Sequence, residues 1–401
     1  MSEGTGITDV FPAAAPLHDS ISHTIGPAAT PRRLMWWKFR AHRLALASAI
    51  VILLLYLMTL FCGFVAPYDP EFKTGNPLAP PQWPSLVVDG RLQWPPVVFG
   101  MKQTLDMQTF QRRYVPDPTK RFPVALFVHG QPYLLFGFIP ADIHLFGAAE
   151  GALYLMGTDV LGRDLFTRVA YGARISLTVG LVGVTLSLLL GILLGGISGY
   201  YGGRTDTLIQ RLIEVIQCFP SIPLWMALAA ALPAHWSTLQ VYFGITVILS
   251  VVGWTDLARV VRGRFLSLRE EDFVLAAKLS GASQARIIRK HLLPNFMSHI
   301  IASVTLSIPG MILAETSLSF LGIGLTPPAI SWGVLLQAAQ NVNSLVVAPW
   351  LLLPGVMVVV TVLAFNFLGD GLRDAADPYS PAEGRAARWP PCCGSRMFTS
   401  P

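Results

Sequence analysis

The sequence predicts an all-α integral membrane protein with six transmembrane helices and a small, partly β extracytoplasmic insert between helices 1 and 2. Of its 401 residues, 53% are hydrophobic and only 13% are charged, whereas soluble domains carry about 25% charged residues. Several apolar stretches approach the length of about 20 residues that crosses a bilayer. The net charge of +6 does not indicate nucleic-acid binding, because the basic residues flank the apolar stretches and form no aromatic-interleaved basic face. The expected partner is therefore the lipid bilayer.

Each expected span is a run of apolar residues with few charges. The third and fourth are the weakest. Pro220 and Pro223 interrupt the third, since proline breaks the helical hydrogen-bond ladder, and polar residues interrupt the fourth. The six spans are expected at about residues 44–65, 175–198, 212–232, 241–257, 297–321 and 350–368.

The short loops indicate the orientation of the spans. Arg and Lys cluster before the first span, between spans four and five, and after the sixth. The loops 233–240 and 322–349 contain neither residue. Since cytoplasmic loops are enriched in Lys and Arg, both termini are predicted to be cytoplasmic.

The long segment that follows the first span is predicted to be a small folded unit, since structureless loops of this length are uncommon. Asp89-Gly90 between apolar runs is typical of a hairpin turn. A second hairpin is expected with its turn at residues 129–132. We expect its apolar face to pack onto the outer ends of the spans.

The stretch from Glu270 to Asn295 predicts two short amphipathic helices that meet at a sharp turn beneath the membrane. Its apolar residues recur at helical spacing. Gly281 separates the two halves, Ser283 is a candidate N-cap for the second helix, and Pro294 ends it.

This stretch resembles the "EAA" loop of ABC importer permeases, the coupling element that docks into a cleft of the ATPase subunit. The resemblance departs from the pattern at Leu275, which stands where the family has an acidic residue, so a polar contact from this position is in doubt. The matching positions, and the residues it implies for coupling, are Leu275, Ala276, Ala277, Gly281, His291, Leu292, Pro294 and Asn295.

A second stretch before the second span resembles the Gly-Thr-Asp…Gly-Arg-Asp element of the C-type subunit of oligopeptide and dipeptide importers. Two interpretations remain: these groups fix the entry of the span, which we favour because such ion pairs are usually structural, or they contact the substrate. The residues in register are Gly157, Thr158, Asp159, Gly162, Arg163, Asp164 and Arg168.

Together with Ala314–Gly324 and Leu368–Tyr379, these matches cover most of residues 35–379. The resemblance implies a pore-forming permease in a bacterial inner membrane that pairs with a second, homologous permease, two ATPase subunits and an extracytoplasmic substrate-binding protein. It implies import of dipeptides or oligopeptides, with nickel chelates or short sugars as alternative cargo. ATP and Mg would be bound by the partner ATPases, since no phosphate-loop motif occurs here; we expect no enzyme activity, cofactor or metal in this chain.

The domain organisation follows from these matches. The expected parts are a disordered cytoplasmic leader (1–30), a cytoplasmic approach with the first span (31–65), the insert (66–156), the permease core (157–379) with its coupling loop (265–295), and a disordered cytoplasmic tail (380–401).

Glu315 is an acidic residue within the fifth span. Burying a carboxylate in a membrane is costly, so Glu315 is either a residue of the transport pathway or an interhelix contact. The alternative functional class is an ion-coupled secondary transporter, which would typically carry several ionisable residues at mid-membrane.

Overall fold

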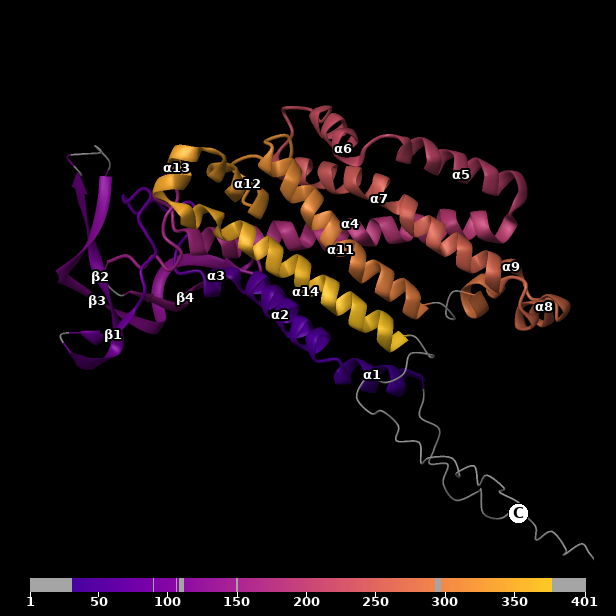
Figure 1. Cartoon of the computed structure of the whole chain (residues 1–401), viewed down its shortest axis with the longest axis horizontal. Helices are drawn as coiled ribbons and strands as arrows, with labels where there is room; N and C mark the ends of the chain where they lie inside the picture. The colour runs from indigo at the N-terminus through magenta and orange to yellow at the C-terminus, as the bar shows by residue number, and fades with distance from the viewer. Residues whose placement is uncertain are drawn as a thin grey trace, which may run out of the picture.

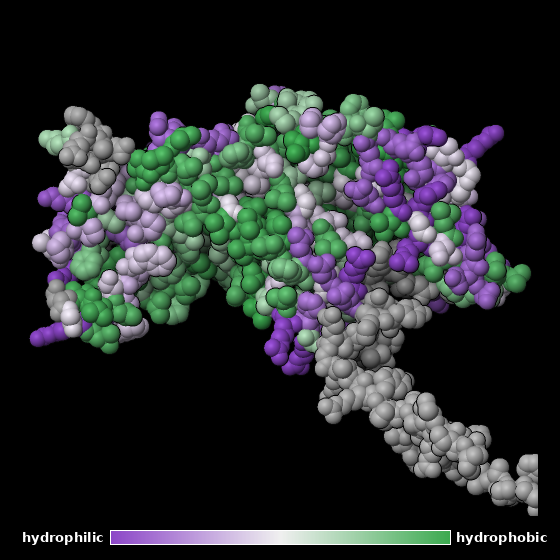
Figure 2. Space-filling view, viewed as in Figure 1, coloured by the Kyte–Doolittle hydropathy of each residue, from purple (hydrophilic) through white to green (hydrophobic). Residues whose placement is uncertain are grey.

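The computed structural model describes residues 31–376 except 89, 106, 108–111, 149–150 and 293–296. The expected leader and tail, together with Pro294 and Asn295, lie outside the described residues. The molecule is an elongated bundle of helices with a β-sheet at one end of its long axis and short helices at the other (Figure 1). Apolar residues dominate the surface between these two more polar ends (Figure 2).

In the described part of the chain, five helices are long and apolar enough to cross a membrane. A sixth candidate is the pair formed by α5 (Gly203–Cys218) and α6 (Ser221–Ala230), which meet at a bend of 86°. Pro220 lies at this bend, in agreement with the expected interruption. The five long helices are α2 (Arg43–Leu60), α4 (Leu165–Tyr201), α7 (Thr238–Leu268), α11 (Met297–Phe320) and α14 (Leu353–Ala376).

Two of these helices are longer than the apolar runs that predicted them. Helix α7 continues through the charged stretch 259–268, because charged side chains end the hydrophobic signal without ending the helix. Helix α4 begins ten residues before the expected second span and has 37 residues.

Helices α4 and α7 pack closely because a glycine stripe faces the contact. At Gly195 an added Cβ would overlap with the carbonyl oxygen of Ala258, and at Gly199 it would lie 2.7 Å from that of Arg262. Small residues at spacings of four let membrane helices approach backbone to backbone.

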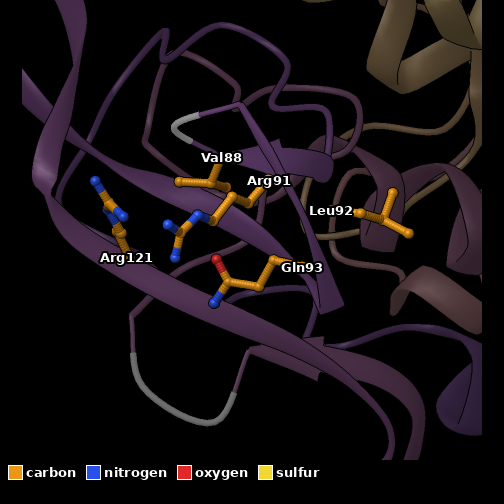
Figure 3. Close-up of a pocket in the computed structure, with 5 residues that line it drawn as sticks. All are labelled: Val88, Arg91, Leu92, Gln93 and Arg121. Carbon is orange, nitrogen blue, oxygen red and sulfur yellow. The ribbon is translucent and has the colours of Figure 1, made fainter.

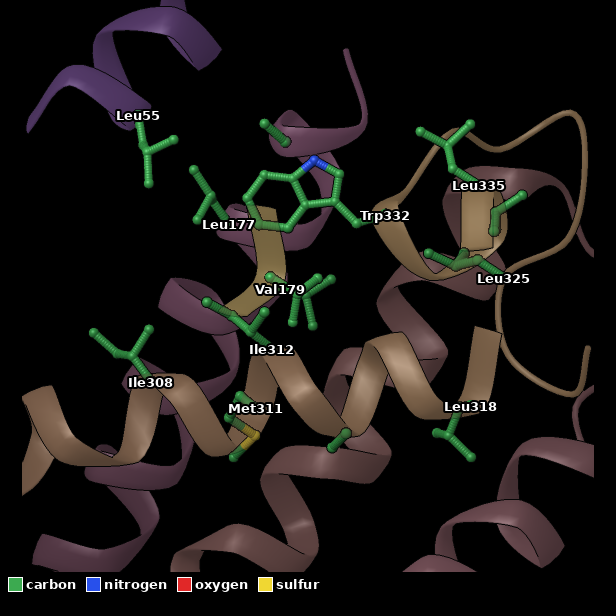
Figure 4. Close-up of a cluster of buried hydrophobic side chains, with 14 of the residues drawn as sticks. Leu55, Leu177, Val179, Ile308, Met311, Ile312, Leu318, Leu325, Trp332 and Leu335 are labelled. Carbon is green, nitrogen blue, oxygen red and sulfur yellow. The ribbon is translucent and has the colours of Figure 1, made fainter. Parts of the chain in front are cut away.

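The main core joins α4, α11 and α12 (Trp332–Gln337) around Trp332 (Figure 4). The Trp332 indole is fully buried and donates a hydrogen bond to the carbonyl of Val169 at 3.1 Å. Leu177 and Ile312 pack in the same cluster. Tryptophan suits this position because its large apolar ring fills the core while its N–H reaches a backbone acceptor.

The insert contains a four-stranded antiparallel sheet in the order β1-β2-β3-β4. Val88 pairs with Arg91, which confirms the first expected hairpin, although Asp89 itself lies outside the described residues. The strands are β1 (Ser85–Val88), β2 (Arg91–Leu105), β3 (Arg112–Leu135) and β4 (Ile139–Ala148).

The turn expected at residues 129–132 was wrong. Strand β3 passes through this stretch with a register shift between His129 and Tyr133, and the chain reverses instead at Phe136–Phe138. Gly137 there has φ of 84°, a conformation that glycine adopts without strain. Residues 129–132 form an irregularity within β3, of the kind in which an extra residue on one strand bends that strand.

The remaining elements are short and lie at the two ends of the bundle. They are α1 (Pro31–Ala41), α3 (Cys62–Val65), α8 (Asp272–Leu279), α9 (Gln284–Arg286), the π-helical η1 (Ile287–Leu292), the 3-10 turns η2 (Ala338–Gln340) and η3 (Pro349–Leu352), and α13 (Val342–Val347).

Candidate functional site

The candidate coupling loop is formed by α8, a tight turn, α9 and η1. At the turn the N–H of Gly281 donates to the carbonyl of Lys278 at 3.0 Å, and that of Ala282 donates to Ala277 at 3.1 Å. Gly281 has φ of 73°, which is the left-handed conformation that commonly ends a helix. Ser283 precedes α9 as expected, but its side chain makes no capping hydrogen bond.

The loop is anchored to the helix bundle through one apolar face. Val274, Ile287 and Leu292 are buried, and they pack with Val261 and Phe265 of α7. Their burial holds α8 in place from behind and leaves its other face free.

The outward face of α8 is apolar and exposed. Leu275 is 45% exposed, Leu279 is 90% exposed, and Ala276 lies exposed between them. Leu275 and Leu279 are four residues apart and so share one helix face. Sequence analysis missed Leu279, although its spacing from Leu275 was a usable signal.

The loop also contacts the C-terminal end of α4. The hydroxyl of Tyr201 donates to the side-chain oxygen of Gln284 at 3.1 Å. A hollow of about 400 Å³ lies beside this bond, with Lys278 and Ala282 among the residues that line it. The loop therefore touches α4 as well as the two helices that flank it in sequence. Of the other predicted residues, His291 lies in η1, while Pro294 and Asn295 are outside the described residues.

The Gly-Thr-Asp…Gly-Arg-Asp motif (residues 157–168) lies at the opposite end of α4. Thr158 is fully buried; its hydroxyl donates to the carbonyl of Asn76 at 2.6 Å and accepts from the N–H of Ala79 at 2.7 Å. The Trp350 indole donates to the Thr158 carbonyl at 3.0 Å. Gly157 has φ of 77°, and an added Cβ would lie within 2.8 Å of Trp350 and Ala79. These contacts join the start of the insert to the segment that precedes α14.

The charged residues of the motif form one network. Asp159 accepts from the Arg163 side chain at 2.8 Å, and Arg168 lies 3.7 Å from the same carboxylate. Glu71 bridges both guanidinium groups, at 2.9 Å from Arg163 and 3.0 Å from Arg168. Gly162, with φ of 77°, forms the turn inside the motif. Because Asp159 and Arg168 are buried and internally paired, the contacts favour the structural interpretation over substrate contact.

Asp164 caps the N-terminus of α4. One carboxylate oxygen accepts from the N–H of Thr167 at 2.8 Å, while the other is buried without a hydrogen-bond partner among the described residues. Burial raises the pKa of Asp164 to about 7, against the opposing effect of the hydrogen bonds from Thr167. Desolvation disfavours the charged form of a carboxyl group.

Glu315 lies in a buried polar cluster between α4, α11 and α12. Its carboxylate accepts from Ser176 of α4 at 3.2 Å and from Ser319 at 2.9 Å. Ser176 in turn accepts from the backbone N–H of Trp332 at 3.1 Å. Glu315 is fully buried, so the geometry favours the interhelix contact over the pathway interpretation.

A further hollow of about 500 Å³ lies on the sheet, away from both motifs (Figure 3). Arg91 and Arg121, from adjacent strands, line it together with Val88 and Gln93, and Leu92 points away from the arginines. The two guanidinium groups make this surface positively charged. None of the residues predicted as functional lies there.

The predicted residues thus form two separate groups at the two ends of α4, with Glu315 in the bundle between them (Figure 1). Among the described residues no group of three or more His, Cys, Asp or Glu side chains is placed to hold a metal ion.

The chain matches known families in two separate segments. Residues 187–379 match a model described as "Binding-protein-dependent transport system inner membrane component". Residues 30–81 match "N-terminal TM domain of oligopeptide transport permease C". The four-stranded sheet lies between the two matched segments.

Curated relatives agree with these families. The dipeptide transport system permease protein DppC of Bacillus subtilis is 45% identical over 224 residues, which are 55% of this chain and 68% of the relative. The oligopeptide transport system permease protein OppC of Bacillus subtilis is 40% identical over 223 residues, or 55% and 70% of the two chains. The OppC protein of Haemophilus influenzae is 40% identical over 260 residues, or 64% and 81%.

These matches do not favour the secondary-transporter alternative, since the relatives are named as permeases of peptide transport systems. The long matched segment contains the candidate coupling loop, and the short one contains the first span. The chain belongs to the family of inner membrane components of binding-protein-dependent transport systems, within the group of oligopeptide and dipeptide permeases of the C type.

Proposed function

We propose that this chain forms one half of the pore of an ATP-driven importer and that its cargo is a peptide of the dipeptide or oligopeptide class. The peptide class rests on the names of the relatives. Nickel chelates and short sugars are the alternative cargo. As a permease the chain is not an enzyme, and ATP is hydrolysed by separate subunits.

In the proposed arrangement the chain crosses a bacterial inner membrane six times, with α5 and α6 together as a broken third span. Both termini are cytoplasmic, in accordance with the Lys- and Arg-rich loops. The parts are the leader (1–30), the first span with its approach (31–65), the insert (66–156), the core (157–379) and the tail (380–401).

The proposed partners are a homologous second permease, two ATPases that bind ATP and Mg, and an extracytoplasmic binding protein that delivers the cargo. Closure of the ATPases would push on the coupling loop (265–295) and reorient the spans, as in other transitions in which packed elements move as rigid bodies.

The observation that carries this proposal is the exposed apolar face of α8. Leu279 is 90% exposed on a loop whose other face is firmly packed. Solvent-exposed apolar surface on a well-anchored element is typical of a protein–protein contact. We therefore place the ATPase contact at Leu275, Ala276, Ala277 and Leu279, with Gly281 forming the turn.

The experiment is a pull-down of the tagged chain from mild detergent, with co-purified proteins identified by mass spectrometry. We expect a second permease and ATPases with phosphate loops. The variant Leu279→Asp should lose the ATPases and keep the second permease. Leu92→Asp is the matched control, because Leu92 is a similarly exposed leucine on the sheet at the other end of the molecule.

The identity of a recovered binding protein would narrow the cargo. Recovery of the chain alone, with Leu279→Asp behaving like the wild type, would contradict the importer proposal.

A further inference from the structure

The tip of the β3–β4 hairpin exposes apolar side chains and contains no charge. Leu134, Phe136, Phe138 and Ile139 are all exposed, and Phe138 is 73% exposed. The segment from residue 133 to residue 141 contains no Asp, Glu, Lys or Arg. Scattered exposed apolar side chains are normal, but a contiguous group of them marks a contact with a protein or a membrane.

The hairpin runs along the chain that leaves the first span and contacts it at several places. The side-chain oxygen of Gln131 accepts from the N–H of Asp69 at 2.8 Å. Closer to the span, the Tyr133 ring packs against Gly63 of α3 so tightly that a Cβ would have no room. The rings of Phe64 and Phe127 also meet, at 6.2 Å, so β3 packs on this segment at several points.

The tip itself reaches the outer end of the first span. The rings of Phe136 and Phe61 meet at 5.6 Å in an edge-to-face arrangement, and Phe61 directly follows the last residue of α2. The tip therefore lies at the level at which the spanning helix leaves the membrane.

The surface beside the tip is apolar. Helix α2 exposes Leu53, Leu57 and Leu60, as expected of a spanning helix at the edge of the bundle. The exposed group on the hairpin continues this apolar surface outward. Aromatic side chains are enriched where a membrane meets water, and the strand hydrogen bonds of the hairpin leave few backbone groups that need water.

We propose that the tip of the β3–β4 hairpin, centred on Phe136 and Phe138, inserts into the outer interface of the bilayer and anchors the sheet to the membrane beside the first span. The occupant of this surface is lipid. The proposal needs only the membrane position of α2 and is independent of the cargo and of the coupling loop.

The test is a depth measurement on the full chain in liposomes of phosphatidylcholine and phosphatidylglycerol. The native cysteines are replaced by serine, and Phe138→Cys is labelled with a polarity-sensitive fluorophore. The quencher is a spin label carried near the headgroup end of a lipid chain. Ile139→Cys is a second labelling position if Phe138→Cys does not fold.

His129→Cys is the matched control. The His129 side chain is 74% exposed on the same hairpin, but by strand rise it lies about 20 Å farther from the tip. We expect several-fold stronger lipid quenching at position 138 than at position 129, with a blue-shifted emission at position 138.

Equal quenching at the two positions would overturn the proposal. It would also be overturned if the label at position 138 is open to aqueous iodide in liposomes and becomes shielded only when the binding protein or the second permease is added. In that case the tip is a protein interface.

Discussion

At the scale of single residues, most polar groups that stood out in the sequence hold the ends of helices. Asp164 caps α4, and Asp159 organises a turn and an ion-pair network. Glu315 joins three helices through serine hydroxyls. Each is buried and bonds to groups of this chain, although one oxygen of Asp164 has no hydrogen-bond partner among the described residues. Their first role is therefore to fix positions.

Asp164 predicts a pH dependence of stability. Its pKa rises from 3.8 to about 7 on folding, mainly through burial. The folded chain therefore binds a proton that the unfolded chain releases between these values, and the contribution of Asp164 to stability falls as pH rises from about 4 to about 7. Asp164→Asn, which keeps the acceptor for Thr167, should flatten this part of the profile. Thermal unfolding of the purified chain across this pH range is the measurement, and an unchanged profile in the variant contradicts it.

Glu315 predicts a difference between two substitutions. Glu315→Gln keeps an acceptor for the serine hydroxyls and should fold. Glu315→Ala leaves the hydroxyls of Ser176 and Ser319 buried without their partner, at a cost of about 1–3 kcal/mol for an unsatisfied group. Denaturant unfolding in detergent checks this order. Equal stability of the two variants would contradict this account. If Glu315→Gln folds normally but weakens transport at low cargo concentration, the carboxylate belongs to the pathway.

At the scale of elements, the α4–α7 contact depends on the absence of side chains. Gly195→Ala should push the two helices apart and cost several kcal/mol, because the added methyl group meets the backbone of Ala258. Gly263→Ala on α7 is the matched control: an added Cβ there meets nothing within 4 Å, and alanine favours the helix by about 1 kcal/mol over glycine. Melting temperatures of the two variants should move in opposite directions, and a shared direction would refute this account of the contact.

Elements were predictable from the sequence where one local signal dominates. Long apolar runs located the five long helices, and Asp89-Gly90 located the first hairpin. The second hairpin turn was misplaced because Gly130 and Pro132 are typical of turns, while Gly137 among aromatics gives a weaker signal. The end of α7 was missed because hydrophobicity marks the residues that are apolar enough for the membrane. It does not show where the helix itself ends.

Tertiary contacts were beyond the sequence for a different reason. The bonds of Thr158 to Asn76 and Ala79 cross about 80 positions of chain, and no local pattern encodes such a pairing. The anchoring of the coupling loop by Ile287 and Leu292 followed from helical spacing, but the burial of Val274 and the bond from Tyr201 to Gln284 did not.

At the scale of the whole molecule, the sheet is separable from the helices at one place. The backbone N–H of Gln82 donates to the Tyr154 carbonyl at 2.7 Å, and the N–H of Tyr154 donates back to the Gln82 side chain at 3.1 Å. The chain thus enters and leaves the sheet side by side, so a short Gly-Ser linker can replace residues 85–150 while the bonds between Gln82 and Tyr154 stay in place. The shortened chain also loses the bond from Asp69 to Gln131 and the packing of Tyr133 on Gly63.

This deletion tests the role of the insert. If the insert caps the outer mouth or helps dock the binding protein, the assembled transporter should keep its basal ATP hydrolysis and lose stimulation by the loaded binding protein. ATP hydrolysis in liposomes, with and without binding protein, is the measurement. Stimulation equal to that of the wild type would exclude both roles.

Helix α4 has a mechanical consequence. It has 37 residues and no proline, which makes it about 55 Å long. It begins at the Asp164 cap and ends at the Tyr201 contact with the coupling loop, so it joins the two ends of the bundle. Because α4 has no kink, it moves as a rigid body, and a tilt of about 5° about one end moves the other end by about 5 Å over that length. If the two ends of the bundle open independently, the movement must take place in helices that can bend. Candidates are α11, with its internal Pro309, and the bent α5–α6 pair.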